Sequence, residues 1–136
     1  FKHAYAHAPL GDGRWLVTEV SDGRLDDVRP LLGPDVVWHL PPFANAEPFR
    51  GIEAVLRFLA EAPAQFYEQG SMSIEPVFTS VEAGNAACLA TLRATTRHGR
   101  PYENRYGFFA RIASGQLVEV WELLDTVKMQ EQMKPA

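Results

Sequence analysis

Apolar and polar side chains alternate through most of the second half of the chain, and this period of two predicts β-strands. Turn residues, several of them glycine, separate the alternating segments. The predicted strands are residues 73–81, 86–97, 103–113 and 118–125, with turns at 82–85, 97–101 and 114–115. Consecutive strands joined by such short turns form an antiparallel meander. The second half is therefore expected to be one sheet of four strands.

The first half of the chain carries apolar side chains at helical spacing. Residues 52–66 repeat them every three or four positions from Ile52 onward, which predicts an amphipathic helix. The segment 25–32 predicts a shorter helix that stops at Gly33-Pro34. The other predicted elements are a helix at 13–20, a strand at 35–40, a proline-rich loop at 41–51 and a short helix at 127–133.

The order of these elements indicates an α+β fold in a single domain spanning residues 1–136. About three helices from the N-terminal half are expected to cover one face of a curved, mostly antiparallel sheet. This arrangement can form a cone-shaped barrel that holds one apolar ligand. Residues 1–12 are expected to be a flexible N-terminal segment.

Composition excludes several classes of partner. The formal net charge of −4 argues against nucleic-acid binding, and no apolar run approaches the roughly 18 residues of a membrane-spanning helix. The single cysteine, Cys88, cannot form an internal disulfide, and its apolar neighbours predict a packed thiol. A cytoplasmic location is the default expectation.

One acidic residue interrupts an apolar strand face near the C-terminus. In the segment VEVWELLDT, alternation puts Glu122 on the same face as Val118, Val120 and Leu124. Burial beside Val120, Leu124 and Phe108 would raise the pKa of this carboxyl, so that it could hold and pass a proton near neutrality. The alternative interpretation is a structural carboxylate paired with an arginine or a tyrosine.

Two side chains on the preceding strand share the phase of Phe108. Asn104 and Tyr106 are predicted to face inward, where an amide and a phenol could bind a carbonyl oxygen or stabilise an enolate. A hairpin centred on His98-Gly99 would place Thr95 and Arg93 opposite them. Arg93 is then either a pocket cation or a residue of an oligomer interface, since a one-residue change of register turns the strand over.

The chain resembles the SnoaL-like proteins of the ketosteroid isomerase and nuclear transport factor 2 superfamily. The segment GRPYENRYGFFARIASGQLVEVWELLDT is similar to their C-terminal half, and LDDVRPLLGPDVVWHLP and FRGIEAVLRFL are similar to earlier elements. The resemblance covers roughly residues 14 to 127. It implies a cone-shaped α+β barrel, usually a homodimer, with a pocket between sheet and helices. Members include polyketide cyclases, steroid isomerases, epoxide hydrolases, dehydratases and non-catalytic binders.

The resemblance assigns an acid–base role to Glu122, with Asp125 as the terminal acid of the same motif. Two departures affect the expected activity. Leu40 stands where ketosteroid isomerases have their basic aspartate, and Arg93 lacks the acid two residues later that limonene-type epoxide hydrolases need. Neither known catalytic set is complete.

Apolar residues are expected to line the pocket around these polar groups. The predicted substrate-binding residues are Trp15, Trp38, Leu40, Phe108, Val120 and Leu124, and the predicted catalytic residues are Glu122, Tyr106, Asn104 and Arg93. His39 follows Trp38 and should point to the opposite face. His3 and His7 lack a third ligand, so neither a metal nor a cofactor is expected.

Two functions remain open at this point. The first is an enzyme that uses acid–base catalysis, without a cofactor, on a small, apolar, oxygenated molecule, as an isomerase, cyclase or hydrolase. The second is a non-catalytic module that binds a ligand or dimerises. A homodimer is expected in which an apolar strand face containing Cys88, Ala90, Leu92 and Ala94 is covered.

Overall fold

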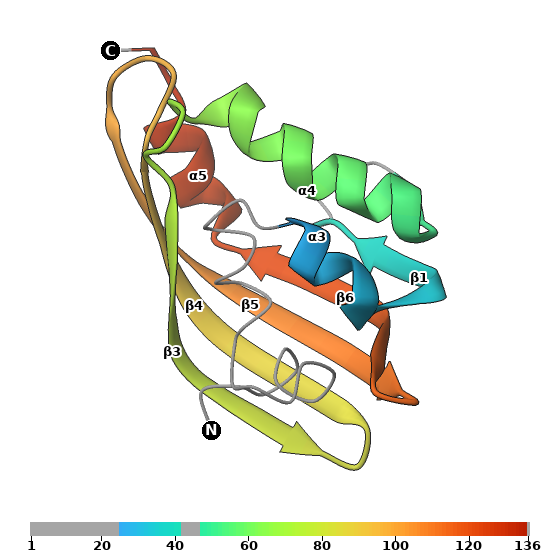
Figure 1. Ribbon diagram of the computed structural model, residues 1–136. Coiled ribbons are helices and arrows are strands. Elements are labelled where there is room, and N and C mark those ends of the chain that lie inside the picture. Colours follow the sequence, from blue (N-terminus) through green and yellow to red (C-terminus); the bar gives the residue numbers. More distant parts are fainter. Residues whose placement is uncertain (1–24, 42–46, 136) are drawn as a thin grey trace.

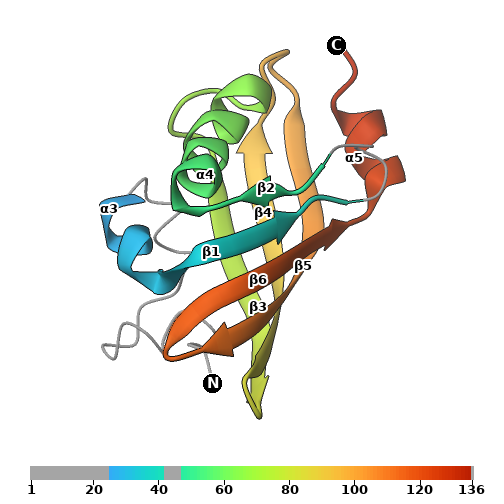
Figure 2. The same ribbon diagram turned by 90° about the vertical axis from the view of Figure 1, so that its right-hand side faces the viewer.

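Six strands form one open, mixed sheet in the computed structural model, which describes residues 25–41 and 47–135. The strand order is β2-β1-β6-β5-β4-β3, and β1 and β6 are the parallel pair (Figures 1 and 2). The strands are β1 (Leu32–His39), β2 (Phe49–Arg50), β3 (Ser73–Glu82), β4 (Asn85–Thr95), β5 (Pro101–Ala113) and β6 (Gln116–Leu124). The sheet curves strongly, and its edge strands β2 and β3 do not meet.

Helices lie against the concave side of this sheet. The described helices are α3 (Leu25–Val28), a following 3-10 turn (Arg29–Leu31), α4 (Ile52–Phe66) and α5 (Thr126–Gln132). Figure 1 shows α4 running across the concave side, with α5 at one end of it. The predicted α+β cone is confirmed, although the sheet is not closed. The predicted helix at 13–20, the segment 1–12 and Trp15 lie outside the described residues.

The long helix and the meander follow the sequence pattern closely. Helix α4 has the predicted bounds and buries Val55 and Leu59 on its apolar side. It begins after Gly51, whose φ of +88° is readily adopted only by glycine, and it contains Pro63 in its last turn. The strands β3 to β6 pair consecutively and antiparallel, as expected for a meander.

The chain around Gly33 differs from the prediction. The segment predicted to be helical to residue 32 ends at Leu31, and Leu32 already pairs with Leu117 of β6. A side chain at Gly33 would lie 3.3 Å from the Leu117 carbonyl oxygen, so glycine permits this close approach of two strands. Strand β2 was also missed, because its two residues follow a proline-rich loop.

The hairpin between β4 and β5 pairs in a different register from the predicted one. Thr95 pairs with Pro101, which centres the hairpin on His98 and places Leu92, rather than Thr95, opposite Asn104. This register turns β4 over relative to the prediction. The predicted outer face with Cys88, Ala90 and Leu92 is therefore wrong, since these side chains are buried on the concave side.

The single cysteine is packed as expected. Cys88 is 2% exposed, and burial raises the pKa of its thiol to about 12. Within residues 25–41 and 47–135, no helix has the length and apolar composition to span a bilayer.

Candidate active site

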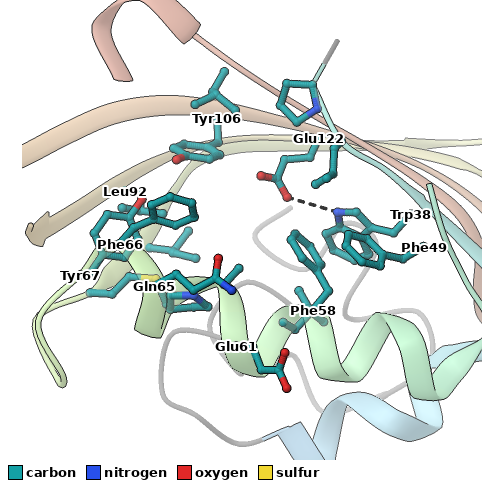
Figure 3. Close-up of a pocket in the computed structure, with 18 of the residues that line it drawn as sticks. Trp38, Phe49, Phe58, Glu61, Gln65, Phe66, Tyr67, Leu92, Tyr106 and Glu122 are labelled. Atoms are coloured by element: carbon teal, nitrogen blue, oxygen red, sulfur yellow. Dashed lines mark hydrogen bonds between the residues drawn. The ribbon is translucent and has the colours of Figure 1, made fainter. Parts of the chain in front are cut away.

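A cavity of about 550 Å³ lies between α4 and the concave side of the sheet. Five predicted apolar or aromatic residues and the predicted carboxyl line it: Trp38, Leu40, Tyr106, Phe108, Leu124 and Glu122. Figure 3 shows Glu122 and Tyr106 on the sheet side of the cavity and Phe58 on the helix side. The alternation of β5 and β6 therefore brings their inward polar groups to one apolar space.

Glu122 points into this cavity, as the sequence predicts. It pairs with Phe108 across the sheet, and its Oε1 accepts a hydrogen bond of 3.2 Å from Nε1 of Trp38 (Figure 3). Burial raises the pKa of Glu122 to about 7, although the Trp38 hydrogen bond acts in the opposite direction. The carboxyl can therefore exist in both protonation states near neutral pH.

Strand β6 reaches this orientation after an irregularity at its start. The register between β5 and β6 shifts between Arg111 and Ile112, so Leu117 is fully buried while Val118 is half-buried. From Val120 onward the strand alternates as predicted, with Val120, Glu122 and Leu124 facing inward. Val120 itself is fully buried but does not line the cavity.

The indole of Trp38 contributes more than an apolar wall. An indole N–H is a donor only, and a carbonyl oxygen accepts better than an acid hydroxyl, so this bond favours the neutral carboxylic acid with its hydrogen on Oε2 of Glu122. The Trp38 ring also packs at 6.1 Å from the ring of Phe58 and 6.5 Å from that of Phe108. These contacts fix the donor relative to the carboxyl.

Replacing Trp38 by phenylalanine is expected to raise the pKa of Glu122 above about 7, because the hydrogen bond that favours the carboxylate is lost. The measurement is a pH titration of the Glu122 carboxyl carbon by NMR. Phe58→Leu, which changes the packing beside Trp38 but keeps the indole, is the control. An unchanged or lower pKa in Trp38→Phe would contradict the role given to this bond.

Three tyrosine hydroxyls gather at the other end of the cavity. The hydroxyl oxygens of Tyr106 and Tyr102 lie 3.0 Å apart, and the rings of Tyr67 and Tyr102 are 5.4 Å apart. Tyr67 and Tyr106 line the cavity (Figure 3). Burial raises the pKa of both phenols, so they remain protonated near neutrality and can donate hydrogen bonds.

Sequence reasoning missed two of these tyrosines. Tyr102 has the phase of Asn104 and Tyr106, but the strand was predicted to begin one residue after it. Tyr67 ends α4 and joins the sheet through a bridge to Thr96, a contact between distant parts of the sequence. The phase of β5 could have identified Tyr102, whereas no local signal identifies Tyr67.

Asn104 faces the interior but does not line the cavity. Its Nδ2 donates to the hydroxyl of Tyr102 at 3.1 Å and to the carbonyl of Asp125 at 2.9 Å. Its Oδ1 accepts from the backbone N–H of Arg105 at 2.8 Å. The predicted direct contact with a ligand is therefore not supported.

Arg93 lies on the side of the sheet away from the cavity. Its Nε donates to Glu103 at 2.7 Å, and its second contact is with Glu75 at 3.4 Å. About half of its side chain is exposed. The corrected register explains this position, because Leu92 takes the inward place and the flanking strands supply acids for Arg93. The pocket role proposed for Arg93 is not supported.

His39 also points away from the cavity, as alternation predicts. Its Nε2 lies 2.6 Å from Glu119, and its ring stacks on Trp121 with centroids 5.1 Å apart. Arg111 lies over the same indole at 5.7 Å. Among the described residues, no group of three or more potential metal-ligating side chains lies close enough together to hold an ion.

Flexible and aromatic side chains that the sequence did not single out complete the cavity wall. Phe49 and Phe58 stack with centroids 4.6 Å apart on one side. Met129 and Met133, from α5 and the residue after it, line another part. Helix α5 contains no fully buried residue, so these two methionines belong to a lightly packed element.

Solved structures of similar fold cover nearly the whole chain. IdmH, a candidate polyketide cyclase from Streptomyces antibioticus, is 26% identical, with a TM-score of 0.76 over 96% of this chain and 99% of IdmH. TerC, crystallised with polyporic acid, is 18% identical, with a TM-score of 0.78 over 95% of this chain and 97% of TerC.

A protein of unknown function from Burkholderia pseudomallei, similar to nuclear transport factor 2, is 22% identical, with a TM-score of 0.73 over 87% of this chain and 92% of that one. A search of curated proteins finds no significant match. The sequence model of the SnoaL-like domain matches residues 14–120. The chain therefore belongs to the SnoaL-like family, and its fold is similar to those of solved proteins that resemble nuclear transport factor 2 and ketosteroid isomerase.

Proposed function

We propose that the protein is an isomerase, cyclase or hydrolase that acts by acid–base catalysis on a small, largely apolar, oxygenated molecule. The observation that carries this proposal is one carboxyl, with a pKa of about 7, in an otherwise largely apolar cavity. General acids and bases work best when their pKa lies near the working pH. The likeness to IdmH supports the cyclase or isomerase form of the proposal.

The proposed proton transfer uses groups already present in the cavity. Ionised Glu122 removes a proton from a carbon next to a ligand carbonyl, and the electron pair moves to the carbonyl oxygen. A tyrosine hydroxyl, from Tyr106 or Tyr67, donates a hydrogen bond to that oxygen as its negative charge develops. The enolate carbon then attacks a second carbonyl carbon of the same molecule, whose oxygen takes the electron pair and the proton held by Glu122. Alternatively, an enolate conjugated with a second double bond takes the proton back from Glu122 at the far carbon.

A ligand-binding module without catalysis is the second candidate. Leu40 replaces the catalytic aspartate of steroid isomerases, and Arg93 lies outside the cavity, so neither known catalytic set is present. Aromatic side chains could fill the cone of a non-catalytic module, but Phe109 is 44% exposed and points away from the cavity. That position favours the enzyme, because Phe109 does not occupy the space a substrate would need.

The test is a screen of polyketide, terpenoid and steroid-like compounds, with binding followed by thermal shift and product formation by mass spectrometry. The enzyme proposal expects ligands that are converted, whereas the second candidate expects ligands that are bound unchanged. The control is Ala54→Trp, which adds a large ring to the cavity wall from α4 and should prevent binding. Binding that survives this change would place the ligand elsewhere.

We also propose a homodimer, formed through the side of the sheet that faces away from α4. There Phe78, Phe109 and Leu123 are 55%, 44% and 44% exposed. Arg111 and Glu119 contribute opposite charges to the same side, with Nε and Oε1 3.7 Å apart. A surface with both signs can complement a second copy across a two-fold axis.

One chain has a mass of 15.2 kDa, and analytical sedimentation is expected to give a particle of twice that mass. Phe109→Asp is expected to shift the protein to the monomer, because it places a charge beside the exposed apolar side chains of Phe78 and Leu123. A wild-type protein that sediments only as a monomer would contradict the proposal. A cytoplasmic location stays a prediction.

A further inference from the structure

The hydrogen bonds of Asn104 have a defined direction. A backbone N–H can only donate, and a backbone carbonyl can only accept. Oδ1 of Asn104 faces the N–H of Arg105, and Nδ2 faces the carbonyl of Asp125, so the orientation of the amide is unambiguous. The second hydrogen of Nδ2 is therefore donated to the hydroxyl oxygen of Tyr102.

This donation limits how the neighbouring hydroxyls can pair. Tyr102 accepts from Asn104, and its hydroxyl lies within hydrogen-bonding reach of two others, that of Tyr106 at 3.0 Å and that of Tyr67. The hydrogen of Tyr102 is therefore donated to Tyr106 or to Tyr67, because a buried donor without an acceptor is costly.

The hydrogen at the end of this chain of hydroxyls is available to the cavity. Tyr106 and Tyr67 both line the cavity, and each can accept a hydrogen from a neighbouring tyrosine and offer its own. Because Tyr102 must donate to one of them, an open chain of the three hydroxyls ends with a free hydrogen on Tyr106 or on Tyr67. A ligand oxygen in the cavity accepts that hydrogen.

We infer that Asn104 is a positioning residue: its amide orients the hydroxyls of Tyr102 and Tyr106 so that the tyrosine end of the cavity binds an acceptor oxygen of the ligand. This inference rests on the proposed function in one respect, that a ligand occupies the cavity. The ligand chemistry that fits is a carbonyl, because a neutral acceptor also tolerates ionised Glu122 in the same space.

Asn104 has a second connection, to the start of α5, which a test must separate from the first. It holds the carbonyl of Asp125, and the side chain of Asp125 accepts from the N–H of Lys128 in the first turn of α5. Loss of Asn104 could therefore act through the helix rather than through the tyrosines. Gln132 offers a control, because its amide joins α5 to both backbone groups of Glu103 without touching a tyrosine.

The test compares two probes of equal shape, 2-acetylnaphthalene and its hydrocarbon analogue 2-isopropenylnaphthalene. The wild-type protein is expected to bind the ketone about five- to tenfold more tightly, as one net hydrogen bond allows. The carbonyl stretching frequency of the bound ketone should fall, since the oxygen accepts a hydrogen bond. Tyr106→Phe and Tyr67→Phe, alone and combined, test whether the donor at this end of the cavity produces both effects.

The variants then separate the possible roles of Asn104. Asn104→Ala is expected to lose most of the preference for the ketone and most of the frequency shift. Tyr102→Phe leaves the hydrogen bond from Asn104 to the Asp125 carbonyl in place and should lose part of the ketone preference and part of the frequency shift. Gln132→Ala should retain the full preference and the full shift. Tyr102→Phe gives the answer even if Asn104→Ala does not fold.

The inference is overturned if Asn104→Ala and Tyr102→Phe keep the wild-type preference, or if Gln132→Ala loses as much. A wild-type protein that shows no preference for the ketone overturns it as well. All these readings are binding measurements made without turnover, so failure of the proposed catalysis leaves them unchanged.

Discussion

Glu122→Gln is expected to lower the turnover of any substrate found for this cavity by about 10²- to 10⁴-fold, the usual contribution of general acid–base catalysis. Glutamine keeps the size of the side chain and an oxygen that can accept the hydrogen bond from Trp38, but it cannot exchange a proton near neutrality. Ligand affinity should change little. The measurements are kcat with excess substrate and Kd by calorimetry.

Glu61→Gln is the matched control for this change. Glu61 also borders the cavity, but it lies on α4 and is exposed, and Figure 3 shows its carboxylate directed away from Glu122. The same chemical change there should leave turnover within about twofold of wild type, as expected for a surface substitution. Equal turnover in Glu122→Gln and wild type would remove Glu122 from the mechanism.

The unfolding free energy of the wild-type protein, relative to Glu122→Gln, is expected to fall by up to about 3 kcal/mol as the pH rises from about 4.5 to about 7. Between these values the unfolded chain releases the Glu122 proton, whereas the folded protein keeps it. The folded state then binds more protons, so stability decreases as pH increases. Below pH 4.5 the group has no effect on the slope.

Denaturant titrations of both proteins at a series of pH values, at one protein concentration, measure this difference. Above the folded pKa the wild-type protein carries a charge in an apolar cavity, and the glutamine variant does not. The stability of the wild-type protein relative to the variant should therefore be lowest above the folded pKa. Curves that stay parallel from pH 4 to pH 8 would show that the carboxyl is not buried as described.

The inward orientation of Glu122 was predictable because it depends only on local alternation. Strand β6 is regular from Val120 to Leu124, so strict alternation predicts which side chains face inward even when the neighbouring strand is unknown. The bounds of α4 were predictable for the same reason, since its apolar spacing is continuous. Local periodicity was sufficient in both elements.

The position of Arg93 was not predictable, because it depends on one turn. Thr96 is fully buried, and its hydroxyl accepts from the N–H groups of His98 and Arg100, so the turn is centred on His98 rather than between His98 and Gly99. A shift of one residue reverses every side chain of β4. Nothing in the local sequence indicates that a threonine side chain closes the turn.

The two ends of the cavity differ in how firmly they are built. Around Trp38 the wall consists of packed aromatic rings on β1, β2 and α4, which leave little freedom to adapt to a bulkier ligand. Near α5 it consists of Met129 and Met133, unbranched thioethers that change conformation easily. We therefore expect selectivity to be strict for the part of a substrate beside the indole and permissive for the part beneath the C-terminal helix.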